Sequence, residues 1–339
     1  MPSRATYDYL VKKGYEVEKD PYSKYDCLES NDDLETLFEV LNSVKDKNGN
    51  PAVLTANVLV ANPDFERIKQ DNFERYHYEL VTETFKKYPN HDKSFALWKE
   101  GYQKGFFIPQ YHGREHLNVD RWMLDLQSGN QYLQEAFEQQ MCTFSFLPSY
   151  LRFGYMEGLD FFSEVEKQTK HEILRDGHEQ FVNLMGYPSK TFIANCYIWH
   201  PDFERTLAEI GIQAMQSNVF QLVPWNKGDK HSLRRKLRYT GKRNQFDQVY
   251  TVRNAYFEPS LQNCKDSVNS CLQQVKTAFM NSKPAIISMH RLNFIGGVFP
   301  ENRRRNLKML QSLLESVSKF WPEIEYMSSV SLYNTIRNN

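Results

Sequence analysis

Strand-like and helix-like segments alternate along most of this chain, and this alternation constrains its fold more than any other feature. The apolar, β-rich runs lie at 52–62, 106–111, 191–199, 212–217, 249–257, 285–290 and 323–329. The segments of helical period lie at 31–46, 119–141, 165–186, 201–211, 264–282 and 302–320. Repeated strand–helix units predict an α/β fold with a mainly parallel sheet that is closed or nearly closed.

One segment breaks this alternation. Residues 219–250 are long, basic and without a clear period, so we expect them to form an excursion or a hairpin. No stretch rich in Pro, Gly or Ser divides the chain. The sequence therefore predicts one domain spanning 1–339, with an inserted segment around 219–250.

The charge balance excludes several classes of partner. Lys plus Arg and Asp plus Glu both number 42, so no bulk charge favours nucleic acid or an anionic membrane. The first twenty residues lack the apolar core of a signal peptide, and no apolar run is long enough to cross a membrane. We expect a cytoplasmic, soluble chain as written, with export still open if residues are missing at its N-terminus. The sequence does not indicate an oligomeric state.

The cysteines and aromatic residues add two weaker expectations. The five cysteines have no CxxC spacing, and Cys264 and Cys271 fit one helical face, so reduced thiols are expected. The 23 Phe, 20 Tyr and 5 Trp exceed what a core needs and suit carbohydrate binding, because sugar rings stack on aromatic side chains.

Polar residues stand where several of the predicted strands end. His112 and His116 follow the run 106–111, Asn195 lies late in the run 191–199, and His290 ends AIISMH. In α/β folds with parallel strands, catalytic residues gather at the carboxyl ends of the strands. We therefore expect these side chains to lie together in an active site.

The stretch HGREH (112–116) allows three interpretations. It is a structural pair of histidines, or the HxxEH motif of zinc peptidases with Glu115 as general base on a helix, or a strand-end turn whose two imidazoles share one ion. Gly113 costs about 1 kcal/mol inside a helix, and Pro109 marks the preceding run as a strand. Side chains four residues apart approach closely enough to bind one metal ion.

The third arrangement resembles the polysaccharide deacetylases of the NodB-homology type, the family-four carbohydrate esterases. Their His-Ser/Thr-x-x-His motif supplies two ligands to zinc or a similar divalent ion. His112 and His116 match those ligands, with Gly113 in place of the Ser or Thr. The family's last motif, Leu-x-His, ends a strand and supplies the general acid. It matches His290, with Ser288 in place of the Leu. The resemblance implies an irregular (β/α) barrel and a metal-dependent hydrolase that removes acetyl groups from a carbohydrate.

The family's first motif is a pair of carboxylates, one a metal ligand and the other the general base. The one Asp-Asp pair in this chain is Asp32-Asp33. Asp33 is therefore a candidate third ligand. Ser30 or Asn31 also fits the N-cap of a helix whose first turn carries both acids, and this capping interpretation is favoured.

The absence of a clear first motif leads to a further expectation. Relatives of this kind carry a strand that ends in two aspartates just upstream of a segment like the start of this chain. Met1 is then an internal methionine, and the barrel is open or incomplete at its N-terminal side. This hypothesis predicts an unpaired strand edge near 52–62, a feature that proteins normally avoid.

Several other residues are candidates for contact with a substrate. The family's Arg-Pro-Pro-Tyr wall is replaced here by ANCYIW (194–199), so the shape of the groove is left open. The candidates are Arg253, Asn195, Trp199 and Tyr111. The alternative interpretation makes them a strand-end cap and ordinary core residues.

The resemblance also implies a mechanism and leaves rivals to it. Metal-bound water attacks the acyl carbon, a carboxylate accepts the proton of the water, and His290 donates a proton to the leaving group. A non-catalytic or truncated carbohydrate-binding relative of the same fold is the first rival, because a missing third ligand removes turnover. A zinc peptidase that uses Glu115 is the second.

Overall fold

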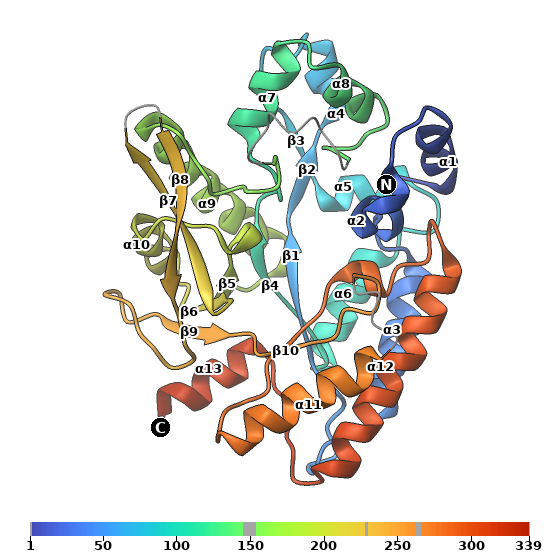
Figure 1. Ribbon diagram of the computed structural model, residues 1–339, viewed down its shortest axis with the longest axis vertical. Coiled ribbons are helices and arrows are strands. Elements are labelled where there is room, and N and C mark those ends of the chain that lie inside the picture. The colour runs from blue at the N-terminus through green and yellow to red at the C-terminus, as the bar shows by residue number, and fades with distance from the viewer. Residues whose placement is uncertain (1, 145–153, 228–229, 262–265, 339) are drawn as a thin grey trace.

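The computed structural model describes residues 2–144, 154–227, 230–261 and 266–338. It is a mixed α/β structure in which helices surround a set of short parallel strands (Figure 1). Within the described ranges no helix is both long and apolar enough to cross a membrane. Cys264, expected on a helical face beside Cys271, lies outside these ranges.

Most strands pair in parallel, as the alternation predicts. The parallel pairs join β1 (Leu54–Leu59) to β4 (Phe107–Gly113), β5 (Thr191–Ile193) to β6 (Ala214–Ser217), β6 to β9 (Val249–Val252), and β10 (Ala255–Tyr256) to β11 (Ile287–Ser288). Two antiparallel pairs join β2 (Ala61–Pro63) to β3 (Tyr78–Leu80), and β7 (Phe220–Lys227) to β8 (Lys230–Leu237). The second of these is a hairpin within the basic segment 219–250.

The strand pairing does not confirm a closed barrel. The described strands form one three-stranded and four two-stranded sheets. Within the part of the chain that the structure describes, β1 has β4 as its one strand partner and β11 has β10 as its own. The open edge expected near 52–62 stays a prediction, and Ala61 and Asn62 of that range pair with β3.

The helices pack around these strands. They are α1 (Arg4–Lys12), α2 (Pro21–Tyr25), α3 (Asn31–Ser43), α4 (Phe65–Gln70), α5 (Val81–Lys87), α6 (Ser94–Gln103), α7 (Val119–Gln127), α8 (Gln131–Glu138), α9 (Glu164–Met185), α10 (Asp202–Glu209), α11 (Ser267–Met280), α12 (Pro300–Phe320) and α13 (Ser329–Asn338). Short 3₁₀ turns are η1 (Val17–Lys19), η2 (Asn195–Tyr197) and η3 (Arg291–Asn293). In Figure 1, α3, α11 and α12 gather near one side, away from the β7–β8 hairpin.

Local sequence signals explain where several helices begin and end. The Ser30 hydroxyl accepts a hydrogen bond from the Asp33 N–H and caps α3. α9 ends at Gly186, which has a φ of 82°. The single helix predicted over 119–141 is wrong: Gly129, with a φ of 77°, separates α7 from α8, and Asn130 caps the second helix.

One large apolar cluster joins helices and strands from most of the chain. Its fully buried members include Phe85, Tyr111, Phe203, Phe257 and Leu313, which come from widely separated segments. Burial of such side chains stabilises the fold by roughly 25 cal/mol for each Å² of apolar surface that is removed from water. This shared core fixes the carboxyl ends of the strands relative to one another.

The strand predicted at 323–329 is wrong. Residues 322–328 are irregular, and α13 begins at Ser329. The Asp46 carboxylate accepts a hydrogen bond from the Tyr326 N–H, and the Lys47 N–H donates to the Ile324 carbonyl. These contacts with the turn after α3 satisfy backbone groups that a sheet would otherwise have paired.

Candidate functional site

A β-bulge presents the first histidine of the HGREH stretch. In the pairing of β1 with β4, Val58 lies opposite Tyr111 and Leu59 lies opposite Gly113, so His112 is the extra residue. A bulge of this kind bends its strand and redirects a side chain, and bulges are frequent next to active sites. The sequence placed His112 at the strand end but did not predict the bulge.

Gly113 has a backbone conformation that other residues rarely adopt. Its φ is 138°, and a Cβ at this position would lie 3.2 Å from the Glu115 carbonyl oxygen and 3.6 Å from Asn195 Oδ1. The backbone conformation and these close distances therefore favour glycine at position 113. This φ also shows that the stretch is not helical, which contradicts the zinc-peptidase alternative.

Glu115 supports that correction. Its carboxylate is 5% exposed and accepts two hydrogen bonds from the Arg114 guanidinium, at 2.7 and 2.8 Å. Arg114 also pairs with Asp176 at 2.8 Å. A carboxylate held in this way forms a buried ion pair and does not face the histidines as a general base.

The two histidines contact each other as neutral imidazoles. The His112 and His116 rings lie 5.1 Å apart, edge to face. The Nδ1 of His112 lies 2.8 Å from the Ile193 carbonyl oxygen, which can only accept, so Nδ1 carries the proton and Nε2 keeps a lone pair. Burial lowers the pKa of His112 to about 3 and that of His116 to about 4. Within the described ranges, the buried Nδ1 of His116 has no hydrogen-bond partner.

His290 stands at the end of β11 and is held by a buried carboxylate. Glu258, which is 4% exposed, accepts a hydrogen bond of 2.7 Å from His290 Nδ1 and one of 3.2 Å from the His290 N–H. The Asn293 amide donates to the same carboxylate at 2.8 Å. The His290 side chain remains 42% exposed. This geometry leaves Nε2 of His290 available for proton transfer.

Glu258 was missed in the prediction of site residues from the sequence. It directly follows the predicted strand 249–257, and this position was the signal that could have found it. Carboxylates at the carboxyl end of a parallel strand point toward the same edge as the histidines. Its pairing with His290 depends on the contact between β10 and β11.

His290 has a weak electrostatic influence on the histidine pair. Charge on His290 is among the influences that lower the pKa of both His112 and His116, after the larger effect of burial. Asp26 acts in the opposite direction and raises the pKa of His116. His112 lies at the bulge in β4 and His290 just after β11, and their convergence with His116 in one active site stays a prediction.

The segment around α2 covers one side of this site. The Tyr22 ring lies 5.6 Å from the His290 ring, edge to face. Burial raises the pKa of Tyr22, and Glu258 and Asp26 act in the same direction. Arg291 holds the segment in place through ion pairs with Asp26, at 3.1 Å, and with Glu29, at 2.8 Å.

Arg253 directly follows β9. Its guanidinium donates to the Tyr197 hydroxyl at 3.0 Å and to the Ser288 hydroxyl at 3.1 Å. Its charge also contributes to the lowered pKa of His112. Arg253 thus has hydroxyl groups as its neighbours, and its contact with a substrate stays a prediction.

Asn195 supports the turn that carries His112. It is 3% exposed, and its amide donates to the His112 carbonyl across 3.4 Å. The two residues that follow, Cys196 and Tyr197, have φ values of 53° and 57°, which are unusual for residues other than glycine. Asn195 therefore lies beneath the site, and its predicted contact with substrate has no exposed surface to support it.

Two aromatic residues predicted to stack on sugar rings are part of the core. Tyr111 and Trp199 are both 0% exposed. The Tyr111 hydroxyl donates to the Leu174 carbonyl at 3.2 Å, and the Trp199 indole donates to the Glu204 carboxylate at 3.0 Å. Neither ring has a free face for a ligand, so the core interpretation applies to both.

Asp33 caps a helix and does not join the histidines. It is 2% exposed, and its carboxylate accepts hydrogen bonds from the N–H groups of Ser30, at 3.0 Å, and Gly296, at 2.9 Å. It also pairs with Arg303 at 2.6 Å. The capping interpretation is confirmed, and the assignment of Asp33 as a third metal ligand is not supported by its contacts.

The described residues fit part of a metal site. His112 Nε2 and His116 Nδ1 are two neutral nitrogen ligands of the kind that zinc binds. A catalytic zinc site needs about three protein ligands. Throughout residues 2–144, 154–227, 230–261 and 266–338, no group of three or more His, Cys, Asp or Glu side chains is arranged to hold a metal ion. We therefore assign no reaction step to a metal on the basis of these residues.

Comparison with known proteins assigns no family. No protein-family model matches the chain, and no curated protein sequence matches it. The backbone is similar to that of a "putative polysaccharide deacetylase" from Mycobacterium smegmatis, with a TM-score of 0.47 and 11% identity over 99% of this chain and 87% of that one. It is also similar to 4-α-glucanotransferase from Thermococcus litoralis, with a TM-score of 0.44 and 12% identity over 95% of this chain. The chain matches 37% of the length of that second protein. Similarities this low establish neither a family nor an activity.

Proposed function

We propose that this chain is a hydrolase of the polysaccharide-deacetylase type, which removes acetyl groups from a carbohydrate. The observations that support the proposal are the edge-to-face contact of His112 with His116 after β4 and the hydrogen bond that holds His290 to Glu258 after β11. These histidines match the family's motifs in residue type and in order along the chain. An irregular barrel, open beside β1, is part of the same proposal.

In this proposal His290 is the general acid and donates a proton to the leaving group. Glu258 accepts a hydrogen bond from Nδ1 of His290 and so orients the imidazole, while Nε2 is left for the substrate. Arg253 and Tyr197, which are hydrogen-bonded to each other, can hold hydroxyl or acyl oxygens of a sugar. Glu258 acts as a positioning residue, because it reaches the substrate through His290.

A divalent metal, with zinc as the first expectation, is the cofactor proposed for His112 and His116. Their low pKa values keep both imidazoles neutral and ready to bind metal at neutral pH. A third ligand is required from outside the described cluster. Zinc titration of the purified chain, beside His112→Ala and His116→Ala, tests this part directly.

A non-catalytic, carbohydrate-binding role is the second candidate. It is favoured by the lack, within the described ranges, of a third metal-ligating side chain beside the two histidines. Such a protein would bind an oligosaccharide and release no acetate from it. The two candidates therefore differ in one measurable product.

The deciding experiment measures acetate released from acetylated oligosaccharides, with and without added zinc. We expect release by the wild-type chain and a loss of about 10²- to 10⁴-fold in His290→Gln, the range for removal of a general acid. His77→Gln is a matched control, because His77 pairs with Asp71 and is not among the groups that influence the site. Oligosaccharide binding without acetate release would favour the second candidate.

A further inference from the structure

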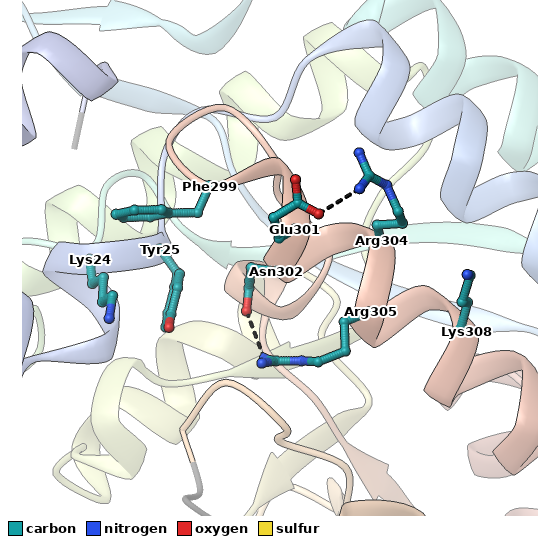
Figure 2. A pocket seen from close by; sticks show the side chains of 8 residues that line it. All are labelled: Lys24, Tyr25, Phe299, Glu301, Asn302, Arg304, Arg305 and Lys308. Atoms are coloured by element: carbon teal, nitrogen blue, oxygen red, sulfur yellow. Dashed lines mark hydrogen bonds and ion pairs between the residues drawn. The ribbon is translucent and has the colours of Figure 1, made fainter.

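A pocket with an excess of positive charge lies between α2 and the start of α12. Its volume is about 520 Å³. Figure 2 shows the side chains of both helices around it, with the Arg305 guanidinium extending from α12 toward the side where Tyr25 and Lys24 lie. The cations that line it are Lys24, Arg304, Arg305 and Lys308, and the one carboxylate is that of Glu301.

Most of this positive charge is not neutralised by carboxylates. Arg304 pairs with Glu301 at 2.5 Å. Arg305 donates to amide oxygens, those of Asn306 at 3.0 Å and Asn302 at 3.2 Å. Within the part of the chain that the structure describes, neither Lys24 nor Lys308 forms an ion pair. The pocket therefore carries a local positive excess, although the chain as a whole has a net charge of zero.

Two aromatic rings complete the lining. The Tyr25 and Phe299 rings lie 5.7 Å apart, edge to face. The Lys24 ammonium lies 5.1 Å from the centre of the Tyr25 ring and 5.7 Å from that of Phe299. The Arg4 guanidinium also lies over Phe299, 4.6 Å from the centre of the ring. Cations bind carboxylate or sulfate groups, so this lining suits an anionic ligand.

A buried hydrogen-bond network joins the pocket to the His290 site. Asn302, which is 3% exposed, accepts from the Ser260 hydroxyl at 2.8 Å. The Ser260 N–H donates to Asn293 Oδ1 at 2.9 Å, and the Asn293 amide donates to Glu258. Glu258 in turn holds His290. A fully connected polar network of this kind keeps the two regions in fixed relative positions.

The short helix α2 makes a second connection. Tyr22, at its start, contacts the His290 ring, while Lys24 and Tyr25, at its end, line the pocket. α2 contains five residues, so these side chains lie within about 8 Å along the helix axis. α2 therefore contributes side chains both to the surroundings of His290 and to the pocket.

We propose that the pocket between α2 and α12 binds the anionic group of an acidic carbohydrate, a carboxylate or sulfate on a sugar next to the one that reaches His290. The reaction at His290 rests on the proposed function, whereas binding of the anion does not. The substrate class is thereby narrowed from carbohydrates in general to acidic polysaccharides.

The test measures binding of one acidic oligosaccharide in two forms. The probe is an oligosaccharide of alternating uronate and N-acetylglucosamine, used as the free acid and as its methyl ester, in calorimetric titrations at low and high salt. We expect the acid to bind about tenfold more tightly than the ester, and the difference to shrink at high salt. The variants are Lys24→Gln and Lys308→Gln, with Lys319→Gln on the same helix as the matched control outside the pocket.

Each pocket variant should bind the acid about tenfold more weakly and the ester as the wild type does, because one charge-assisted contact is lost. Equal binding of acid and ester, no binding of either, or acid binding unchanged in both variants would overturn the proposal. Acetate release is measured in parallel from the same acidic oligosaccharide and from a neutral acetylated one. Acid-selective binding without acetate release from either contradicts the hydrolase alone, and acetate release without acid-selective binding contradicts the pocket alone.

Discussion

Two histidine–carboxylate pairs in this molecule have the same chemistry and opposite surroundings. His290 uses one ring nitrogen for Glu258, and its side chain is 42% exposed. His231, on β8, uses both ring nitrogens, at 2.5 Å from Asn226 and 3.1 Å from Asp160, and its side chain is 5% exposed. A proton can pass to a ligand only from a nitrogen that the ligand reaches. The first pair therefore suits proton transfer, and the second anchors the β7–β8 hairpin.

Replacement of His290 should give the largest effect on activity. In His290→Gln we expect acetate release to fall about 10²- to 10⁴-fold, because no group remains to protonate the leaving group. The free energy of unfolding should stay close to that of the wild type, since the side chain is partly exposed. His231→Gln should give the reverse: lower stability and activity retained in the folded fraction. Equal effects of both variants on activity would break the comparison.

The buried pair should have the largest effect on stability. Asp160 is 0% exposed and accepts from Arg121 and His231, both at 3.1 Å. Asp160→Asn leaves these groups without their carboxylate, so we expect a loss of about 3–5 kcal/mol in urea unfolding. Asp247→Asn removes an exposed pair with Arg243 and should cost less than about 1 kcal/mol. Similar losses in the two variants would contradict the anchoring role.

Substitution of Glu258 tests whether the carboxylate of the exposed pair orients His290. Glu258→Gln removes the charge that orients His290, and we expect kcat to fall roughly a hundredfold with little change in KM. A purely structural role would instead lower the yield of folded protein and leave kcat per folded molecule intact. Glu258→Asp, which keeps the charge, should recover part of kcat.

The buried histidine His112 should make the stability of the fold depend on pH. The pKa of His112 is lowered to about 3 in the folded chain, so the unfolded chain binds the additional proton as the pH falls below about 6.5. Stability should therefore be intact above that pH and decrease toward acid. His112→Asn keeps a donor for the Ile193 carbonyl and does not titrate. From about pH 7 to about pH 4.5 the metal-free variant should lose less stability than the wild type, by on the order of 1–2 kcal/mol. Parallel pH profiles in urea unfolding would contradict this expectation.

The smallest expected effect concerns the covering segment. Tyr22→Leu removes the aromatic contact with His290, a contact of roughly 0.5–1.5 kcal/mol. We expect kcat/KM for acetate release to fall about two- to tenfold. Tyr239→Leu changes a 58% exposed tyrosine that follows β8 and serves as the matched control. An identical change in kcat/KM in both variants would show that Tyr22 does not contribute to the site.

Much of the secondary structure was predictable from local sequence. Residues 31–46 and 165–186 form α3 and α9 as predicted, because caps and turn signals act within a few residues. The prediction of one helix over 119–141 failed at Gly129, where a break that lies inside an apolar pattern is a weaker signal. The strand predicted at 323–329 failed because Asp46 and Lys47, remote in sequence, bind its backbone.

The candidate site was predictable in part. His112, His116 and His290 were expected at strand ends, and Arg253 beside them, because parallel strands bring their carboxyl ends to one edge. Glu258 was not predicted, and Asn195 was predicted as a contact residue although it is buried beneath the site. Aromatic type alone could not distinguish a sugar platform from core, so Tyr111 and Trp199 were misplaced.

The sequence by itself determined the α/β alternation, the capping of α3 by Ser30 and Asp33, and the positions of three histidines at strand ends, since each depends on residues close in the chain. The tertiary structure decided which side chains meet. The bulge at His112 needs β1 as a neighbour, the orientation of His290 needs Glu258 from the segment after β10, and the basic pocket needs α2 against α12. These contacts join residues far apart in sequence, and their free energy comes from burial in a shared core that no local pattern encodes.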